Sequence, residues 1–298
     1  MSGADPRPRV VLVDGVPMSG LIAAAADPRG VIVAFHGGAS TAAYFDCPGH
    51  PRLSLLRAGA ALEYTVIALD RPGYGASAPY PDAMQRPEQR VALAYGAIDK
   101  ILGSSPRGAG LFLLAHSAGC ELAVRMVADE TAEHAGLLGL ELAGTGLQYA
   151  DAANEILKTA TATTRPVGLR ELLWQPAHLY PAEVLAGITN SSTGAFYEAT
   201  MTKEWPRQDF PALAGEVGVP VQFSVAEFER VWKSDPEALA EIAAMFTGSP
   251  RFVINEQVGS GHNLSLSVSA AAYHLKVLSF VEDCVVARQS ATTKLEAG

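Results

Sequence analysis

The sequence predicts an α/β fold, with a mostly parallel β-sheet at the centre and helices on both of its faces. The chain has 298 residues, 49% of them apolar and only 18% charged, which is typical of a globular protein. Short runs rich in Val, Ile, Leu and Phe recur between glycines, prolines and aspartates, without the polar alternation of a half-exposed strand. Ala- and Leu-rich stretches with helical spacing lie between these runs. This alternation of strands and helices indicates crossover connections and a sheet covered on both sides.

The first predicted element is an antiparallel hairpin, in which residues 10–13 and a second run from Val16 flank the turn Asp14-Gly15. Buried strands and helical stretches then follow in turn. The expected buried strands are 30–35, 64–69, 111–115, 137–142, 219–225 and 251–254, and the expected helices lie near residues 84–103, 119–130, 234–246 and 264–287. We expect the polar tail beyond Ala287 to be frayed.

The alternation is interrupted once, between residues 147 and 210. This segment has no apolar strand run, and its helical pieces are separated by prolines at positions 166, 176, 181 and 206. Because a compact domain rarely contains a structureless loop of this length, we expect a helical cap over the sheet. The predicted organisation is therefore an α/β core of residues 1–146 and 211–298, with residues 147–210 inserted as a cap.

Charge and cysteine content exclude several kinds of partner. The net charge of −9 disfavours binding to nucleic acid or to an anionic membrane, since both require clustered Lys and Arg. No GxGxxG motif follows a strand, and neither an HExxH pair nor a Cys cluster occurs, so we expect neither a dinucleotide cofactor nor a metal. Cys47, Cys120 and Cys284 are widely spaced, and the polar N-terminus shows no signal-peptide pattern. These features predict a cytoplasmic protein with a small-molecule partner and are compatible with a homodimer.

Chemistry is expected where the strands end, because ligands bind at the carboxyl ends of parallel strands. After the strand 111–115, the segment Ala115-His116-Ser117-Ala118-Gly119 leads directly into a helix. A serine in such a sharp turn needs small residues two positions before and after it, and Ala115 and Gly119 supply them. Ser117 would also lie at a helix N-terminus, where free N–H groups stabilise negative charge. It is therefore a candidate nucleophile, and the alternative is a simple helix cap.

A serine nucleophile requires a base, and histidine is the usual one. His116 adjoins Ser117 on an extended segment, so its side chain should point the other way. His36 belongs to a glycine loop, which it should anchor by hydrogen bonding. Only His262 follows a strand, lies among glycines and occurs late in the chain, which makes it the predicted base. The other four histidines lie in loops, in the cap or in the last helix: His50, His134, His178 and His274.

The base in turn needs a carboxylate that orients it. Glu227 and Glu229 both follow the strand 219–225. We prefer Glu229, because a carboxylate that reaches toward a neighbouring loop should leave the chain beyond the end of the strand. Asp151 and Glu141 are weaker candidates, and Glu227 stays open as the alternative.

Backbone N–H groups must meet the negative oxygen that forms when a carbonyl is attacked. One such donor usually belongs to the residue after the nucleophile, here Ala118, and the other to the loop after an earlier strand. The segment His36-Gly37-Gly38 follows the strand 30–35 and supplies the second donor, for which we expect the Gly38 N–H. Glycine at this point also lets a substrate carbonyl approach closely.

These motifs together resemble the α/β-hydrolase superfamily. The resemblance rests on His36-Gly37-Gly38, on Asp70-Arg71-Pro72-Gly73-Tyr74-Gly75-Ala76-Ser77, on the segment 115–119 and on Gly261-His262-Asn263, in the order serine, acid, histidine. It covers residues from about 9 to 287. It implies that the loop 70–77 shapes the pocket beside the active site. The sequence departs from the family pattern in having Ala115 as the first small residue and a glutamate as the acid.

The combined prediction is a serine hydrolase that cleaves an ester, or a related acyl bond, of a small hydrophobic substrate. Ser117 would attack the carbonyl, His262 would carry the proton, Glu229 would orient His262, and the N–H groups of Gly38 and Ala118 would bind the oxyanion. The alternatives are a thioesterase or acyltransferase, a carbon–carbon bond hydrolase, and a binding protein with little turnover.

Specificity is expected from the cap, which is rich in aromatic residues. We expect Gly37, Trp174, Tyr197 and Trp205 to contact the substrate. The alternative is that the aromatic rings fasten the cap to the core. The cap aromatics are Tyr149, Trp174, Tyr180, Phe196, Tyr197, Trp205 and Phe210.

Overall fold

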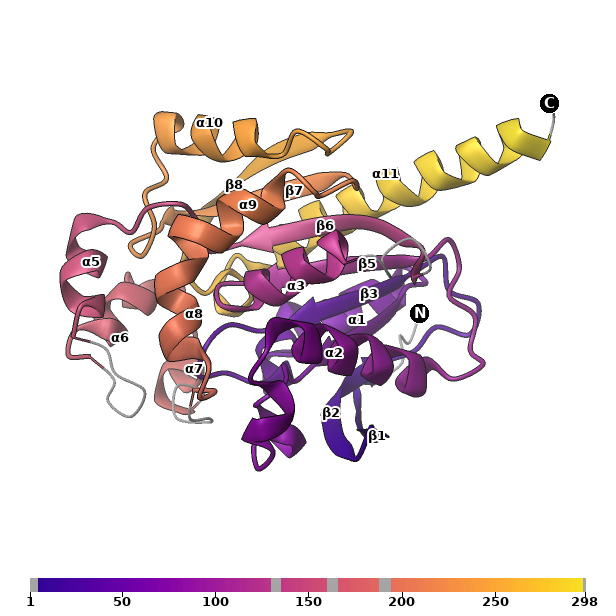
Figure 1. Cartoon of the computed structure of the whole chain (residues 1–298), viewed down its shortest axis with the longest axis horizontal. Helices are drawn as coiled ribbons and strands as arrows, with labels where there is room; N and C mark the ends of the chain where they lie inside the picture. The colour runs from indigo at the N-terminus through magenta and orange to yellow at the C-terminus, as the bar shows by residue number, and fades with distance from the viewer. Residues whose placement is uncertain (1–4, 130–134, 160–165, 188–193, 297–298) are drawn as a thin grey trace.

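The computed structural model describes residues 5–129, 135–159, 166–187 and 194–296. A single eight-stranded sheet forms the centre, with the strand order β1-β2-β4-β3-β5-β6-β7-β8 (Figure 1). The pairs β1·β2 and β2·β4 are antiparallel, and all pairs among β3 to β8 are parallel. The strands are β1 Arg7–Val13, β2 Val16–Ala23, β3 Val31–Phe35, β4 Thr65–Leu69, β5 Leu111–His116, β6 Leu137–Ala143, β7 Val221–Phe228 and β8 Phe252–Gly261. The predicted mostly parallel sheet and its opening hairpin are confirmed.

Helices cover both faces of the sheet, as predicted (Figure 1). Along β3, Val31, Val33 and Phe35 pack toward one face, and Ile32 and Ala34 pack toward the other. This alternation places an apolar core on each side of the sheet. One core also contains residues of α2 Pro87–Leu102, α3 Gly119–Ala128, α9 Phe210–Ala214 and α10 Pro236–Met245, and the other contains residues of α1 Leu55–Ala61 and α11 Ala270–Glu296.

The segment between β6 and β7 is helical where the structure describes it. It contains α5 Asp151–Leu157, α6 Leu169–Leu173, α7 Ala182–Gly187, α8 Glu198–Glu204 and a π-helical turn, Trp205–Asp209, that leads into α9. Residues 160–165 and 188–193 of the predicted cap lie outside the described residues. The division of the chain into a core and a cap stays a prediction.

Two elements are longer than the sequence predicts. Strand β8 continues to Gly261 instead of ending near Ile254, and its residues alternate between exposed and buried positions. As an edge strand with one face open to solvent it carries Asn255, Glu256 and Gln257, so a search for continuous apolar runs finds its first residues and misses the rest. Helix α11 continues to Glu296, so the expectation of a frayed tail beyond Ala287 is wrong.

Two further elements differ from the prediction. Helix α1 is absent from the predicted elements, because Leu55–Ala61 is too short to show a helical period. Strand β7 continues to Phe228, so Glu227 lies within it and Glu229 is the first residue after it.

None of the helices in the described ranges combines the length and the hydropathy that crossing a bilayer requires.

Candidate active site

Ser117 occupies a strained turn between β5 and α3. Its φ is 51°, in the left-handed region that residues other than glycine rarely adopt. Its N–H donates to the Ala143 carbonyl at the end of β6 over 2.8 Å, which fixes the turn on the neighbouring strand. A Cβ on Gly119 would lie 2.5 Å from the Phe35 carbonyl oxygen and 2.7 Å from that of His36. The small residue expected after the serine is therefore required by the close approach of β3.

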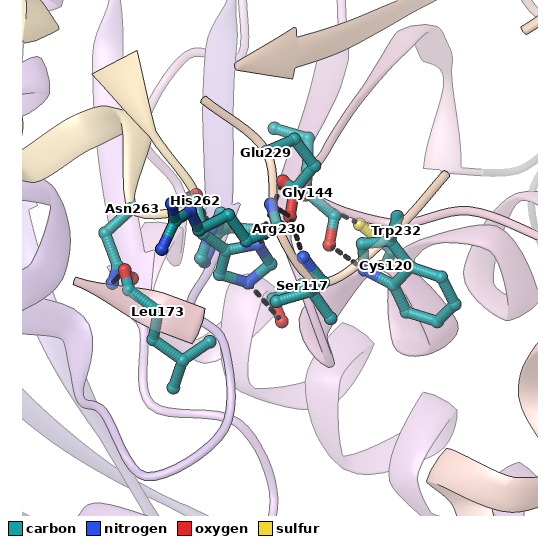
Figure 2. Close-up of polar contacts among 12 residues, drawn as sticks. Ser117, Cys120, Gly144, Leu173, Glu229, Arg230, Trp232, His262 and Asn263 are labelled. Atoms are coloured by element: carbon teal, nitrogen blue, oxygen red, sulfur yellow. Dashed lines mark hydrogen bonds and ion pairs between the residues drawn. The ribbon is translucent and has the colours of Figure 1, made fainter. Parts of the chain in front are cut away.

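His262 lies at the carboxyl end of β8, and its ring lies between Ser117 and Glu229 (Figure 2). The imidazole Nε2 is 3.1 Å from the Ser117 Oγ, and Nδ1 is 3.0 Å from both carboxylate oxygens of Glu229. An ionised carboxylate only accepts hydrogen bonds, so the imidazole proton belongs on Nδ1. Nε2 is then free to accept the proton of the Ser117 hydroxyl.

Glu229 directly follows β7 and is almost completely buried with His262, each side chain being 1% exposed. Its Oε1 accepts hydrogen bonds from the N–H groups of Arg230 at 3.0 Å and Val231 at 2.8 Å. Burial alone would raise the pKa of Glu229, but His262 and the neighbouring backbone donors outweigh it and hold the pKa below its ordinary value. The carboxylate is therefore ionised beside the histidine at neutral pH.

The structure places the other candidate acids elsewhere. The carboxylate of Glu227, an exposed residue of β7, accepts from the Gly259 N–H of β8 at 2.7 Å. Glu141 is fully buried in β6 and accepts from the Tyr273 hydroxyl at 2.9 Å, and burial raises its pKa to about 8. Asp151 begins α5 and is exposed. Within the described ranges, Glu229 is the carboxylate that hydrogen-bonds His262.

Two buried histidines support the site from behind. The Nε2 of His116 lies 2.8 Å from the His262 carbonyl oxygen, and its ring stacks on Tyr44 with the centroids 4.6 Å apart. The Nδ1 of His36 lies 2.7 Å from the Gly37 carbonyl oxygen, and its Nε2 accepts a hydrogen bond from the Arg71 N–H at 3.1 Å. Burial holds the pKa of both histidines well below the usual range, so both are neutral. His50, His178 and His274 make their contacts in other parts of the molecule, and His134 lies outside the described residues.

The expected oxyanion donors lie next to Ser117. A Cβ on Gly37 would lie 3.1 Å from the Ser117 Cβ, and one on Gly38 would lie 3.9 Å from the Ala118 Cβ. Gly37 is buried, whereas Gly38 is exposed. In the described part of the chain, neither the Gly38 N–H nor the Ala118 N–H has a hydrogen-bond partner. Two free backbone donors therefore border the serine on the accessible side.

The sequence profile of the alpha/beta hydrolase family matches residues 32–273, which include Ser117, Glu229 and His262. The chain belongs to the alpha/beta hydrolase family. No curated protein sequence matches this member of the family. In the described topology, Ser117 follows β5, Glu229 follows β7 and His262 follows β8.

Solved structures with a similar fold cover nearly the whole of this hydrolase-family chain. A lipase in its open form is 14% identical with a TM-score of 0.68, and the match covers 94% of this chain and 99% of the lipase. A thermophilic esterase from Thermogutta terrifontis is 16% identical with a TM-score of 0.62, over 94% and 99% of the two chains. A thioesterase domain from the curacin biosynthetic pathway is 17% identical with a TM-score of 0.63, over 92% and 99%. At these identities the likeness concerns the fold alone.

Two residues that the sequence analysis did not single out join the site of this alpha/beta hydrolase. Arg71, in the loop 70–77, is fully buried, and its guanidinium forms an ion pair with Glu198 at the start of α8. The Tyr74 hydroxyl also donates to Glu198, over 2.6 Å. The position of Arg71 within a recognised loop was a signal that could have been used. Nothing in the sequence around Glu198 distinguishes it from other glutamates on a helix.

The aromatic residues expected to contact substrate have different surroundings. Trp205 is 3% exposed, its Nε1 donates to the Thr145 hydroxyl at 3.0 Å, and it stacks on Phe210, so it packs the helical segment onto the core. Trp174 is half-buried against Tyr180, near the loop that carries His262. These contacts favour a packing role for Trp205 and leave Trp174 accessible.

Tyr197 borders a cavity of about 530 Å³ between α2, α3 and α8. Its hydroxyl donates to the Pro72 carbonyl at 2.8 Å, and the Arg90 guanidinium lies 4.1 Å above its ring. The described lining is mixed, with Met84 and Met201 beside charged groups, and it does not include Ser117 or His262. Tyr197 lines this cavity, whereas the adjacent Glu198 contacts Arg71 and Tyr74.

Proposed function

We propose that the protein is a serine hydrolase that cleaves a carboxylic ester of a small hydrophobic substrate through an acyl-enzyme on Ser117. The observation that carries this proposal is the position of the His262 imidazole, which is within hydrogen-bond distance of Ser117 on one side and of Glu229 on the other. Membership of a hydrolase family and a fold similar to that of lipases and esterases support it.

Acylation begins when the Ser117 Oγ attacks the ester carbonyl carbon while His262 Nε2 takes the hydroxyl proton. The carbonyl oxygen becomes negative and accepts from the N–H groups of Gly38 and Ala118. Glu229 stabilises the imidazolium by its own charge. Collapse of this intermediate breaks the bond between the carbonyl carbon and the ester oxygen. His262 gives its proton to that oxygen, and the alcohol leaves.

Deacylation repeats the same steps with water. His262 Nε2 takes a proton from a water molecule as the water oxygen attacks the acyl carbon, and the oxyanion forms again between Gly38 and Ala118. The bond between the acyl carbon and Ser117 Oγ then breaks, and the proton returns to the serine. The products are a carboxylic acid and the free enzyme. Every proton is accounted for by His262, and no cofactor is required.

We propose that the helical segment 147–210 acts as the cap over this site and determines which substrates enter. Gly37 lies against Ser117, where a side chain would collide with His116 and Ser117, Trp174 is half-buried near the loop that carries His262, and Tyr197 borders the cavity between α2, α3 and α8. Apolar and aromatic surfaces of this kind suit a neutral hydrophobic group. We further propose a small-molecule substrate and a cytoplasmic location, in keeping with the acidic composition.

A fluorophosphonate probe tests the nucleophile. It should label the wild-type protein and fail to label Ser117→Ala, because phosphonylation needs the Oγ. The matched control is Ser249→Ala, because the Ser249 hydroxyl bonds the Val219 and Arg251 carbonyls before β8, away from the reacting groups. Labelling that persists in Ser117→Ala would refute the assignment, and a wild-type protein that is never labelled would point to a binding protein instead.

Turnover of a substrate panel tests the bond. p-Nitrophenyl esters of increasing acyl length, the corresponding acyl thioesters and a vinylogous 1,5-diketone should be compared at equal concentration. We expect the short esters to be cleaved fastest. A preference for the thioesters would favour the activity named for the similar thioesterase domain, and exclusive cleavage of the diketone would favour carbon–carbon bond hydrolysis.

A further inference from the structure

Arg71 lies beneath the loop that carries the expected oxyanion donor. Its side chain is fully buried. One terminal nitrogen, NH2, donates to the Gly37 carbonyl at 3.2 Å, and the other, NH1, donates to the Ala118 carbonyl at 3.4 Å. The same guanidinium thus holds the glycine loop and the turn after Ser117 in one arrangement.

The Gly37 carbonyl belongs to the same peptide unit as the Gly38 N–H. A trans peptide is planar, and its C=O and N–H point in opposite directions. Because the carbonyl points at the buried Arg71, the Gly38 N–H points away from it, and Gly38 is exposed on the accessible side of the loop. His36 Nδ1 binds the same carbonyl, which leaves the peptide little freedom to flip. A cation at the carbonyl also polarises the peptide and makes its N–H a stronger donor.

Glu198 supplies the counter-charge for Arg71 from a different part of the chain. It begins α8, its carboxylate is 12% exposed, and it is ion-paired to the same NH2 that binds Gly37. One carboxylate oxygen lies 3.4 Å from the position that a Cβ on Gly38 would occupy. Tyr74 extends this contact, because its hydroxyl donates to Glu198 and accepts from the Ala39 N–H at 3.0 Å. The start of α8 is therefore fastened to the glycine loop at two points.

We propose that Arg71 is a positioning residue that aims the Gly38 N–H at the oxyanion, and that Glu198 makes this aim depend on the seating of α8 over the loop. The proposal rests on the serine hydrolase activity proposed above and deepens it. When α8 is seated, Arg71 is neutralised and the peptide is held. When α8 moves away, Arg71 loses its counter-charge and Tyr74 loses its carboxylate acceptor, so the glycine loop keeps only the bonds that Arg71 and Tyr74 make to it directly.

The charges of the pair have opposite effects on the reaction. A carboxylate beside Gly38 repels the developing oxyanion, and Arg71 cancels that repulsion. Removal of Arg71 alone would leave Glu198 unpaired next to the oxyanion. Removal of both groups would leave a neutral but unclamped loop. The single variant Arg71→Met should therefore be slower than the double variant Arg71→Met/Glu198→Gln.

The test measures kcat and KM for an ester, together with inhibition by a matching trifluoromethyl ketone, whose adduct with Ser117 carries an oxyanion. All rates are divided by the fraction of protein that a fluorophosphonate titrates. We expect Arg71→Met to lower kcat and the ketone affinity about 100-fold, as loss of one oxyanion donor does, with KM changed less than threefold. Arg71→Lys keeps the charge, so its kcat and ketone affinity should be about tenfold higher than those of Arg71→Met. The double variant should show a similar increase over Arg71→Met.

Arg29→Met is the matched control, because Arg29 also pairs with a glutamate, Glu282, but precedes β3 at the opposite end of the sheet. It should leave kcat and the ketone affinity unchanged. If Arg71→Met is unstable, the double variant is tested in its place, since it buries no unpaired charge. A double variant with the full ketone affinity of the wild type would refute the proposal. So would equal losses in kcat and in ester affinity, which indicate general damage. A wild-type protein that the fluorophosphonate does not label would instead refute the serine hydrolase activity itself.

Discussion

Glycine at positions 37 and 119 lets the serine turn, β3 and the glycine loop 36–38 approach one another closely. The Gly119 Cα lies against the backbone of Phe35, and Gly37 lies against the side chains of His116 and Ser117. Neither position requires a positive φ, so it is the lack of space that excludes a side chain there. The reactive geometry therefore depends on backbone packing as well as on the three polar side chains.

Gly119→Ala should destabilise the protein by about 1–3 kcal/mol, because its Cβ would lie 2.5 Å from the Phe35 carbonyl oxygen and β3 or the turn must shift. Urea unfolding measures the change. Gly218→Ala is the control, since a Cβ there meets nothing within 4 Å, and its stability should stay close to that of the wild type. Equal stability of the two variants would show that the serine turn can accommodate a Cβ at position 119 without loss, contrary to the close contact in the structure.

Glu229→Gln should lower kcat for ester hydrolysis by at least about 100-fold, because a neutral amide can present its N–H₂ to His262 Nδ1 and stabilises the imidazolium less. KM should change little. Glu227→Gln serves as the comparison, since Glu227 contacts the Gly259 N–H and not His262. A loss of activity in Glu227→Gln alone would assign the acid to the other glutamate.

At the scale of elements, the helical segment between β6 and β7 is joined to the core by a few specific contacts. Trp205 enters the core beside Phe210 and binds Thr145, just beyond β6. Tyr149 pairs with Trp232 in an isolated bridge, and the rings stack 4.2 Å apart. The Trp232 Nε1 donates to the Gly144 carbonyl, so the loop that carries Glu229 is tied to the end of β6.

Trp205→Ala should destabilise the protein by about 3–5 kcal/mol, as truncation of a buried tryptophan usually does. Phe196→Ala is the matched control in the same segment, because Phe196 is 75% exposed, and its effect should stay within about 0.5 kcal/mol. Thermal unfolding and urea midpoints measure both. A small effect of Trp205→Ala would mean that this tryptophan is available to substrate instead of fastening the segment.

At the scale of the whole molecule, buried ionisable groups make the stability depend on pH. Burial raises the pKa of Glu141 from 4.5 to about 8, so the folded state binds its proton more tightly than the unfolded state does. Its contribution to stability is fully present below about pH 4.5 and is lost as the pH rises through about 8. The lowered pKa of Glu229 has the opposite sign, and its contribution is lost only as the pH falls below about 4.5.

The free energy of unfolding should therefore fall by about 3–4 kcal/mol between pH 5 and pH 8 through Glu141 alone. Glu141→Gln should remove this slope, because glutamine does not titrate and its carbonyl can still accept from Tyr273. Urea titrations at pH 5, 6, 7 and 8 measure the difference between the two proteins at each pH. Parallel curves for wild type and Glu141→Gln would contradict a raised pKa at this position.

Local pattern was sufficient for the features that depend on short stretches of chain. The alternation of apolar runs with helical stretches predicted the parallel sheet, and the residues after strand ends pointed to Ser117, His262 and Glu229, which lie within hydrogen-bond distance of one another through His262. The same reasoning missed the half-exposed second part of β8, which lacks a continuous apolar run, and the short helix α1, which lacks a full helical period.

The sequence by itself determined the fold class, the order of its elements and which side chains stand at the carboxyl ends of the strands, since these follow from hydrophobic period and from the residues at turns. Only the tertiary structure decided which of two neighbouring glutamates faces His262, and that a glutamate at position 198 pairs with Arg71 across 127 residues. Such contacts depend on how loops and helices distant in sequence pack together, and no local pattern records that packing.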